Sequence, residues 1–270
     1  MNKSINSILA AAAVIFTSCA GSYDIKGTSN VSVLDGKQLY LKAYSDNDLK
    51  NIDSCGIVHG QFSFSGRLDS TKLVTLFMDD ESLMPVVLET GATINIKIDN
   101  GQQKVSGTPL NDKLSKFMEE YNQLEMQMSD LSHKQSQAIM NGEDENVTNA
   151  RLAAEAQQIA EKEDKLVTQF IVKNFDNVLG PGVFFMMTAG YQYPELSPWI
   201  EDIMSKATEN FKNDPYVRDY YQKAQENQNI MNGMATPDVA APPQAEASQG
   251  GAAETLQGGP TPNELAQPAN

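Results

Sequence analysis

The chain has 270 residues, with 35 Asp and Glu against 20 Lys and Arg, which gives a formal net charge of −15 at neutral pH. Such acidity argues against a nucleic-acid-binding protein, which needs a basic stripe, and against direct binding to anionic lipid headgroups. Only two cysteines are present, so no disulfide framework is expected and stability must come from packing.

The first 18 residues have the layout of a secretory signal peptide. Lys3 gives a short positive start, and residues 5–16 form an uncharged, largely apolar run. The run has the length of a signal-peptide core and is too short for a transmembrane helix, which takes roughly 20 apolar residues. Small residues then lead to Cys19, an arrangement that resembles the bacterial lipobox, in which the cysteine thiol receives a diacylglyceryl group. We therefore predict lipidation at Cys19, with residues 19–22 as a short tether.

Lipid at Cys19 would attach the protein to a membrane, with no membrane-spanning helix. Two or three acyl chains, palmitate among them, make such an anchor durable. Ala20 stands where some bacteria use Asp to retain lipoproteins in the inner membrane. The expected location is therefore the outer membrane, facing the periplasm, with the cell surface as the alternative.

Residues 23–107 are predicted to form β-strands. Apolar and polar residues alternate over 39–44, 62–65 and 94–98, as in half-buried antiparallel strands. The more uniformly apolar stretches 73–78 and 84–88 are expected to be central strands. Between the runs lie turn pairs: Asp35-Gly36, His59-Gly60, Asp79-Asp80, Thr90-Gly91 and Asn100-Gly101. The spacing predicts an antiparallel β-sandwich or open barrel, and an α+β protein once the following helices are added.

The period changes at Thr108-Pro109, where Thr108 can cap a helix and Pro109 suits its first position. From Leu110 to Leu131 apolar residues recur at alternating steps of four and three. This spacing places them on one face of a helix, as in a coiled coil, and forms a continuous apolar seam. Asn141-Gly142 interrupts this pattern. It predicts one long helix that ends at a turn.

A second apolar seam runs from Leu152 to Phe170 and is interrupted by Glu163, which predicts an antiparallel helical hairpin. Shorter helices are expected near 183–189, 198–206 and 215–228, within a helical region at 108–230. The aromatic and Met residues expected to pack against the hairpin are Phe184, Phe185, Met186, Met187, Tyr191, Tyr193 and Trp199. Residues 231–270 are rich in Ala, Pro, Gln and Gly, and this tail is expected to be disordered.

The residues that could carry chemistry do not form a recognisable catalytic, metal or cofactor motif. His59 and His133 are far apart and lack ligands at metal-binding spacing, so we expect them to be exposed to solvent. Met126 and Met128 could suggest a soft-metal site, but methionine is ordinary core material. Residues 141–146 lack the alternating oxygen ligands of a calcium loop and predict a charged turn.

Two further positions remain as candidates. Cys55 lies close to Asp53 in a predicted strand, where nothing lowers a thiol pKa, so a half-buried structural cysteine is expected. Asp69-Ser70-Thr71 resembles the O-glycosylation sequon of some anaerobic Gram-negative bacteria. Ser70 is therefore a glycosylation candidate, although a polar turn explains the triplet equally well.

Residues 60–66, 84–89 and 105–112, together with the helical stretch 170–216, carry a family resemblance. They resemble the domain of unknown function at the N-terminus of many bacterial lipoproteins whose C-terminal half is a thioredoxin-like thiol-disulfide oxidoreductase domain. The resemblance covers residues 23–227, and its most specific motif is Val-Ser-Gly-Thr-Pro-Leu-Asn-Asp. In two-domain members a Cys-x-x-Cys domain would follow near residue 230, where this sequence has its tail. The resemblance therefore implies an accessory or binding module, and no redox residues are carried over.

The leading hypothesis is a non-catalytic cell-envelope lipoprotein that acts as a binding or interaction module for an unidentified envelope protein or ligand. One alternative is an accessory protein of periplasmic thiol-disulfide chemistry, acting through Cys55 or beside a thioredoxin-like partner. The other is a structural spacer of the envelope. The sequence predicts neither an enzyme nor a nucleic-acid partner, and it leaves the oligomeric state open.

Overall fold

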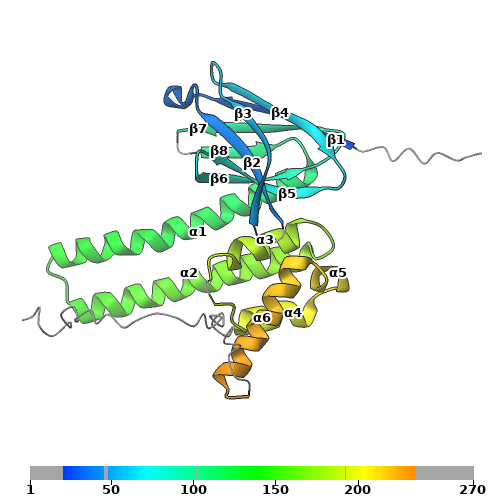
Figure 1. Cartoon of the computed structure of the whole chain (residues 1–270). Helices are drawn as coiled ribbons and strands as arrows, with labels where there is room; N and C mark the ends of the chain where they lie inside the picture. Colours follow the sequence, from blue (N-terminus) through cyan, green and yellow to red (C-terminus); the bar gives the residue numbers. More distant parts are fainter. Residues whose placement is uncertain (1–20, 46–47, 101, 192, 235–270) are drawn as a thin grey trace, which may run out of the picture.

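The computed structural model describes residues 21–45, 48–100, 102–191 and 193–234. The predicted signal peptide, Cys19, Gly101 of the predicted Asn100-Gly101 turn, and residues 235–270 of the predicted tail lie outside the described residues. Eight strands come first along the chain and the helices follow (Figure 1), which confirms the predicted α+β class.

The strands form two four-stranded sheets that do not close into a barrel, so the sandwich is the correct one of the two predicted architectures. Sheet A has the order β4 (Gln61–Leu68), β1 (Gly21–Ser29), β7 (Thr93–Asp99) and β8 (Gln102–Ser106). Sheet B has the order β3 (Asp48–Gly56), β2 (Gln38–Ser45), β5 (Lys72–Met78) and β6 (Glu81–Leu88). Their inner faces share one core, which includes Ile25, Leu41, Phe64, Leu76 and Ile96.

The pairing of β1 with β7 is parallel, with Ile25 opposite Ile94, whereas every other pairing between described strands is antiparallel. The expectation of purely antiparallel strands is therefore wrong for this one pair. The chain leaves sheet A after β4, forms β5 and β6 in sheet B, and returns to sheet A as β7. Parallel strands need such a long connection, which alternation alone does not reveal.

Strand β6 lies at the edge of sheet B and not at its centre, contrary to the sequence prediction for residues 84–88. Its apolar character has another cause. Val86 and Leu88 face the sandwich core, while Val87 on the opposite face packs into the helical core. Pro85 is a signal for the edge position, because proline cannot donate a ladder hydrogen bond and is confined to edge strands.

Helices α1 (Pro109–Met140) and α2 (Glu145–Lys173) form the predicted hairpin, which projects from the rest of the molecule in Figure 1. The turn between them contains Gly142 with a φ of 70°, and Asp144 caps α2 by accepting the Val147 N–H. Thr108 stands at the N-cap of α1, but its hydroxyl does not accept a backbone N–H there. Instead it accepts a hydrogen bond from Asn111 Nδ2 at 2.8 Å.

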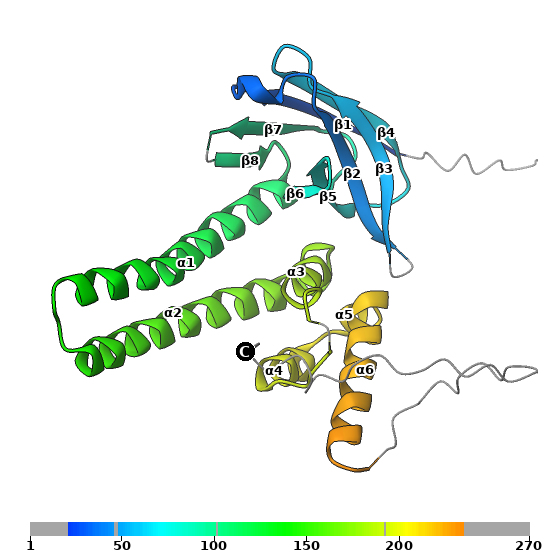
Figure 2. The same cartoon turned by 60° about the vertical axis from the view of Figure 1, so that its left-hand side comes forward.

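The remaining helices are α3 (Leu179–Thr188), α4 (Pro198–Lys206), α5 (Glu209–Lys212) and α6 (Pro215–Met231). Both views place α3 between the sandwich and the other short helices (Figures 1 and 2). Phe184 is fully buried in the helical core, and Trp199 donates a hydrogen bond to Thr168 of α2. Tyr191 and Tyr193 are exposed, so the expectation that they pack on the hairpin is wrong. None of the helices within the described residues is long and apolar enough to cross a membrane.

Candidate functional site

The outer face of sheet B is the surface that meets the short helices. On β2, Leu41 and Ala43 are buried in the sandwich core. Because successive side chains of a strand point to opposite faces, Lys42 and Tyr44 lie on the outer face. Leu73 of β5 packs against the helical core. Sheet B is therefore partly covered by helices and partly open.

Helix α3 comes unusually close to sheet B because it carries glycine at the contact. A Cβ atom on Gly182 would lie 2.3 Å from Cδ2 of Leu73. Two residues earlier in the same helix, a Cβ atom on Gly180 would lie 2.4 Å from the carbonyl oxygen of Asn174. Glycine costs helix stability, and close approach of the helix to its neighbours is the physical reason for it here.

Three aromatic rings from β2, α3 and α6 meet at this junction. The ring centroids of Tyr44 and Phe185 are 4.7 Å apart, and those of Phe185 and Tyr216 are 4.8 Å apart. Tyr44 and Tyr216 are separated by 5.6 Å in an edge-to-face arrangement, which aromatic pairs favour. Tyr44 is 38% exposed. The junction thus offers an aromatic surface that solvent reaches.

A cleft of about 210 Å³ lies beside these three rings. Sheet B and the β2–β3 hairpin contribute residues that include Lys42, Tyr44, Leu49, Lys72, Leu73 and Thr75. The helical region contributes residues that include Val178, Pro181, Phe185, Met186, Asp214 and Tyr216. An apolar and aromatic lining with a few polar groups is typical of small-molecule sites. This cleft is our candidate functional site.

Two lysines, Lys42 and Lys72, border the cleft. The Nζ atom of Lys42 lies 4.5 Å from the ring centroid of Phe77 and 5.8 Å from that of Tyr40, within the range of cation–π contacts. Neither Lys42 nor Lys72 forms an ion pair with any residue in the described part of the chain. Asp214 is the acidic residue that lines the same cleft, and it forms no ion pair with either lysine among the described residues.

The carboxylate of Asp214 also borders the cleft, but helix α6 already uses it. Its Oδ1 atom accepts the backbone N–H groups of Tyr216 and Val217 at 3.1 and 3.2 Å. These donors belong to the first turn of α6, where a carboxylate is stabilised by the helix dipole. Burial raises the pKa of the Tyr216 hydroxyl, with a hydrogen bond to Thr188 acting in the opposite direction. Tyr216 is therefore a neutral hydroxyl at physiological pH.

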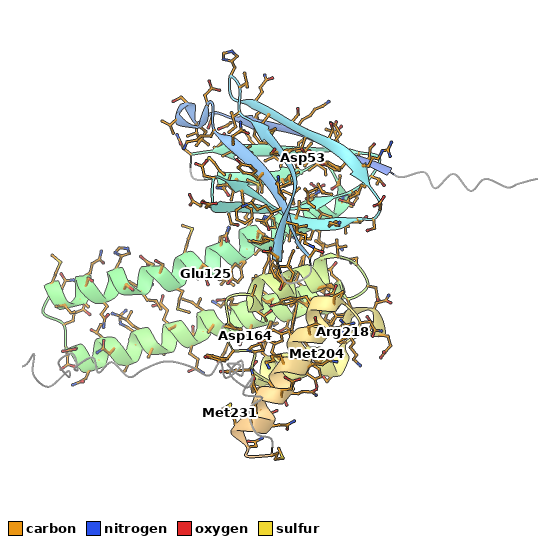
Figure 3. The ribbon with its side chains drawn as sticks, viewed as in Figure 1. Asp53, Glu125, Asp164, Met204, Arg218 and Met231 are labelled. Carbon is orange, nitrogen blue, oxygen red and sulfur yellow. The ribbon has the colours of Figure 1, made fainter. Side chains whose placement is uncertain are left out.

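Cys55 lies on β3, as predicted, and is half-buried. Burial raises the pKa of its thiol to about 11, opposed by a backbone hydrogen bond at Ser63 and assisted by the negative charge of Asp53. Asp53, labelled in Figure 3, accepts a hydrogen bond of 2.9 Å from the Tyr23 hydroxyl. A thiol with this pKa is almost entirely protonated at neutral pH, which does not favour nucleophilic or redox chemistry.

The other residues singled out from the sequence lie apart from one another. His59 occupies the predicted turn with a φ of 51°, His133 lies on α1, and both are exposed, as expected. Ser70 is exposed in the bend between β4 and β5, and its glycosylation stays a prediction. Across residues 21–234, apart from the three short gaps, no three His, Cys, Asp or Glu residues gather as metal ligands would.

The methionines considered as soft-metal ligands also fall at different places. Met128 packs on the small hairpin core with Leu131, whereas Met126 is 72% exposed. Residues 141–144 of the acidic stretch form the predicted turn and residues 145–146 begin α2; Asp144 caps that helix and Glu143 pairs with Arg151 at 3.7 Å. The carboxylates of Glu143 and Asp144 thus have structural partners.

The apolar contact between α1 and α2 is interrupted at Glu163, where the apolar pattern of the sequence is also interrupted. The main helical core ends near Phe117 and Val167, and a separate small core around Leu131 and Ile159 begins beyond Glu163. Burial raises the pKa of the Glu163 carboxyl, the charge of Glu125 raises it further, and a hydrogen bond with Tyr121 lowers it. Figure 3 labels Glu125 on α1 and, on α2, Asp164, the neighbour of Glu163 in sequence.

The fold and cleft define an α+β protein with a sandwich joined to a helical region. Comparison with known families finds a domain of unknown function (DUF4369) at residues 23–114, a match that spans the sandwich and ends within α1. No curated protein and no solved structure shows a significant match to the chain. The family description assigns no activity.

No pattern in the sequence predicted the cleft. Its lining comes from Lys42, Tyr44 and Leu49 and from segments 71–75, 178–186 and 214–216, which come together only when α3 and α6 pack against sheet B. Two signals were available. Gly180-Pro181-Gly182 at the start of a predicted helix indicates a close contact, and the aromatic residues on the polar face of β2 are candidates for a covered or binding surface.

Proposed function

We propose that this chain is a non-catalytic cell-envelope lipoprotein, anchored by lipid at Cys19, that binds a ligand in the cleft between sheet B and helices α3 and α6. The observation that carries the binding role is the aromatic junction of Tyr44, Phe185 and Tyr216 beside a cleft of about 210 Å³. Clefts of this composition at the junction of two structural units are common ligand sites.

The side chains around the cleft favour binding over bond-breaking. Tyr216 is a neutral hydroxyl, and Asp214 is held by the first turn of α6. A general acid or base needs a pKa near the working pH and an open hydrogen-bonding position. The lining instead offers rings, aliphatic groups and two ammonium groups, which hold a ligand through burial and charge.

The binding role is tested by affinity capture from a cell-envelope extract with the full chain, compared with two variants. Tyr44→Ala removes one wall of the cleft, and Tyr193→Ala removes an exposed ring on a different surface, where the residue is 68% exposed. We expect a molecule that the parent chain and the Tyr193→Ala chain retain and the Tyr44→Ala chain loses. Equal retention by all three chains would rule out the cleft as the binding site.

The lipid anchor is tested separately, because it depends on residues outside the described part of the chain. Expression in a lipoprotein-processing bacterium is expected to give an N-terminal peptide that begins at Cys19 and carries the mass of a diacylglyceryl group and an amide-linked acyl chain. Cys19→Ala is expected to abolish both the cleavage and the added mass. An unmodified Cys19 in the processed chain would disprove the anchor and leave the cleft argument intact.

A further inference from the structure

We propose that the cleft binds an amphipathic carboxylate, with an apolar ring or short chain against the aromatic junction and an anionic end beside Lys42. This inference rests on the proposed binding role of the same cleft and adds the chemical class of the ligand. It follows from the lining, the charge and the size of the cleft.

The three aromatic rings of the junction favour an apolar group in the ligand. Tyr44, Phe185 and Tyr216 contact one another at centroid distances of 4.7–5.6 Å, so they form a continuous surface with little freedom to rearrange. Pro181 and Met186 extend this surface along α3. Burying an apolar group here releases water from both surfaces, and a ring gains further from aromatic contacts.

The charged residues around the cleft favour an anionic group in the ligand. Lys42 and Lys72 border the cleft without an ion-pair partner among the described residues. Asp214, the carboxylate at the cleft, keeps its negative charge but accepts the N–H groups of α6, so the lining carries two ammonium groups against one carboxylate. The cleft thus presents excess positive charge in an acidic protein, which favours an anion and disfavours a cation.

The position of Lys42 suits a group that changes partner when a ligand arrives. Its ammonium lies over the Phe77 ring at 4.5 Å, a weak contact at a solvent-accessible site. The flexible four-carbon stem lets the ammonium move to a carboxylate with little cost. Its stem would remain on the outer face of sheet B, against the apolar body of the ligand.

The size of the cleft limits the ligand. Sites for drug-sized molecules usually measure roughly 300–1,000 Å³, whereas this cleft measures about 210 Å³. One ring or a short acyl segment fits, and a larger molecule would extend past Tyr44 and Leu49 into solvent. The two residues are 38% and 43% exposed, which leaves that side open.

The test uses the full chain with Cys19→Ser, which removes the proposed lipid acceptor and leaves every described residue unchanged. Hydrocinnamate is the probe, and its amide is the uncharged analogue of nearly the same shape. Dissociation constants are measured by saturation-transfer NMR for the parent, Lys42→Met, Lys104→Met and Tyr44→Ala chains. Lys104 is an exposed lysine on β8 of sheet A with no described ion pair, so it is the matched control.

We expect the carboxylate to bind about fivefold more tightly than the amide, since partly exposed ion pairs contribute modestly. Lys42→Met should remove most of that difference, Lys104→Met should keep it, and Tyr44→Ala should weaken both probes. Circular dichroism verifies that each variant is folded.

Two results would overturn the inference, and they are distinguishable. If both probes bind equally and Tyr44→Ala weakens both, the cleft is a binding site but not one for anions. If neither probe binds the parent chain at millimolar concentration, the ligand class is wrong. The envelope-capture experiment then decides the binding role by itself.

Discussion

The side-chain amide of Asn111 forms two hydrogen bonds with the backbone of Val87: Nδ2 donates to the carbonyl oxygen and Oδ1 accepts the N–H, each at 2.8 Å. Asn111 thereby pairs with the outer edge of β6 as a further strand would. It is fully buried and lies in the first turn of α1, so this contact joins the helical region to the sandwich. The motif Val-Ser-Gly-Thr-Pro-Leu-Asn-Asp therefore has a structural role.

Asn111→Ala should lower the free energy of unfolding by about 3 kcal/mol, because it leaves the buried N–H and C=O of Val87 without partners. Urea unfolding followed by circular dichroism measures the change. Asn149→Ala is the matched control, since its amide bonds to Gln135 on an exposed surface, and it should cost less than about 0.5 kcal/mol. Equal effects of the two substitutions would contradict the proposed role of Asn111.

Gly182→Ala should destabilise the chain by about 1 kcal/mol, because its Cβ would lie 2.3 Å from Cδ2 of Leu73 and the end of that side chain must move, while the higher helix propensity of alanine offsets part of the cost. Leu73→Ala alone leaves a cavity and is also destabilising. The double variant should be more stable than the sum of the two single effects predicts, since the smaller side chain accommodates the added methyl group. Thermal and urea unfolding of the four chains test this coupling. Strict additivity would show that α3 can shift away from β5.

Glu163→Gln should stabilise the hairpin at neutral pH. In the folded chain the pKa of Glu163 is raised, chiefly by burial, so the folded state binds this proton more tightly than the unfolded state. The free energy of unfolding therefore falls as pH rises through the window between the unfolded and folded pKa values. We expect an increase in Tm of about 2 °C at neutral pH and a smaller one in mild acid.

The matched control for this substitution is Glu161→Gln, which changes an exposed residue of the same helix that bonds to Gln157. It should leave the pH dependence of Tm unchanged. Thermal unfolding of the three chains between mild acid and neutral pH separates the two effects. A parent chain that becomes less stable on acidification within that window, with no difference from Glu163→Gln, would refute the assignment.

Cys55 should react slowly with iodoacetamide at neutral pH. With a pKa of about 11, its thiolate fraction is roughly 100-fold below that of an ordinary cysteine, although higher intrinsic nucleophilicity recovers part of the rate. A net slowing of about tenfold relative to the urea-unfolded chain is expected. Mass spectrometry of the Cys19→Ser chain, in which Cys55 is the sole cysteine, measures the rate. Rapid alkylation of the folded chain would instead support the redox-accessory alternative.

Several features of the fold followed from the sequence because they depend on local periodicity. The seam from Leu110 to Leu131 predicted the first helix, and Asn141-Gly142 predicted the turn that reverses the chain. Alternation in residues 39–44 correctly divided β2 into a core face and an outer face. In each case the residues of a single segment indicate which of its side chains are buried.

Other features were decided only by tertiary structure. Local periodicity does not specify which sheet a strand joins, so the parallel pairing of β1 with β7 and the edge position of β6 escaped prediction. The cleft depends on Tyr44, Phe185 and Tyr216, which are distant in sequence and meet because Gly182 lets α3 approach Leu73. Such contacts arise from the packing of one finished element on another, and that packing, rather than the period of any single segment, creates the site.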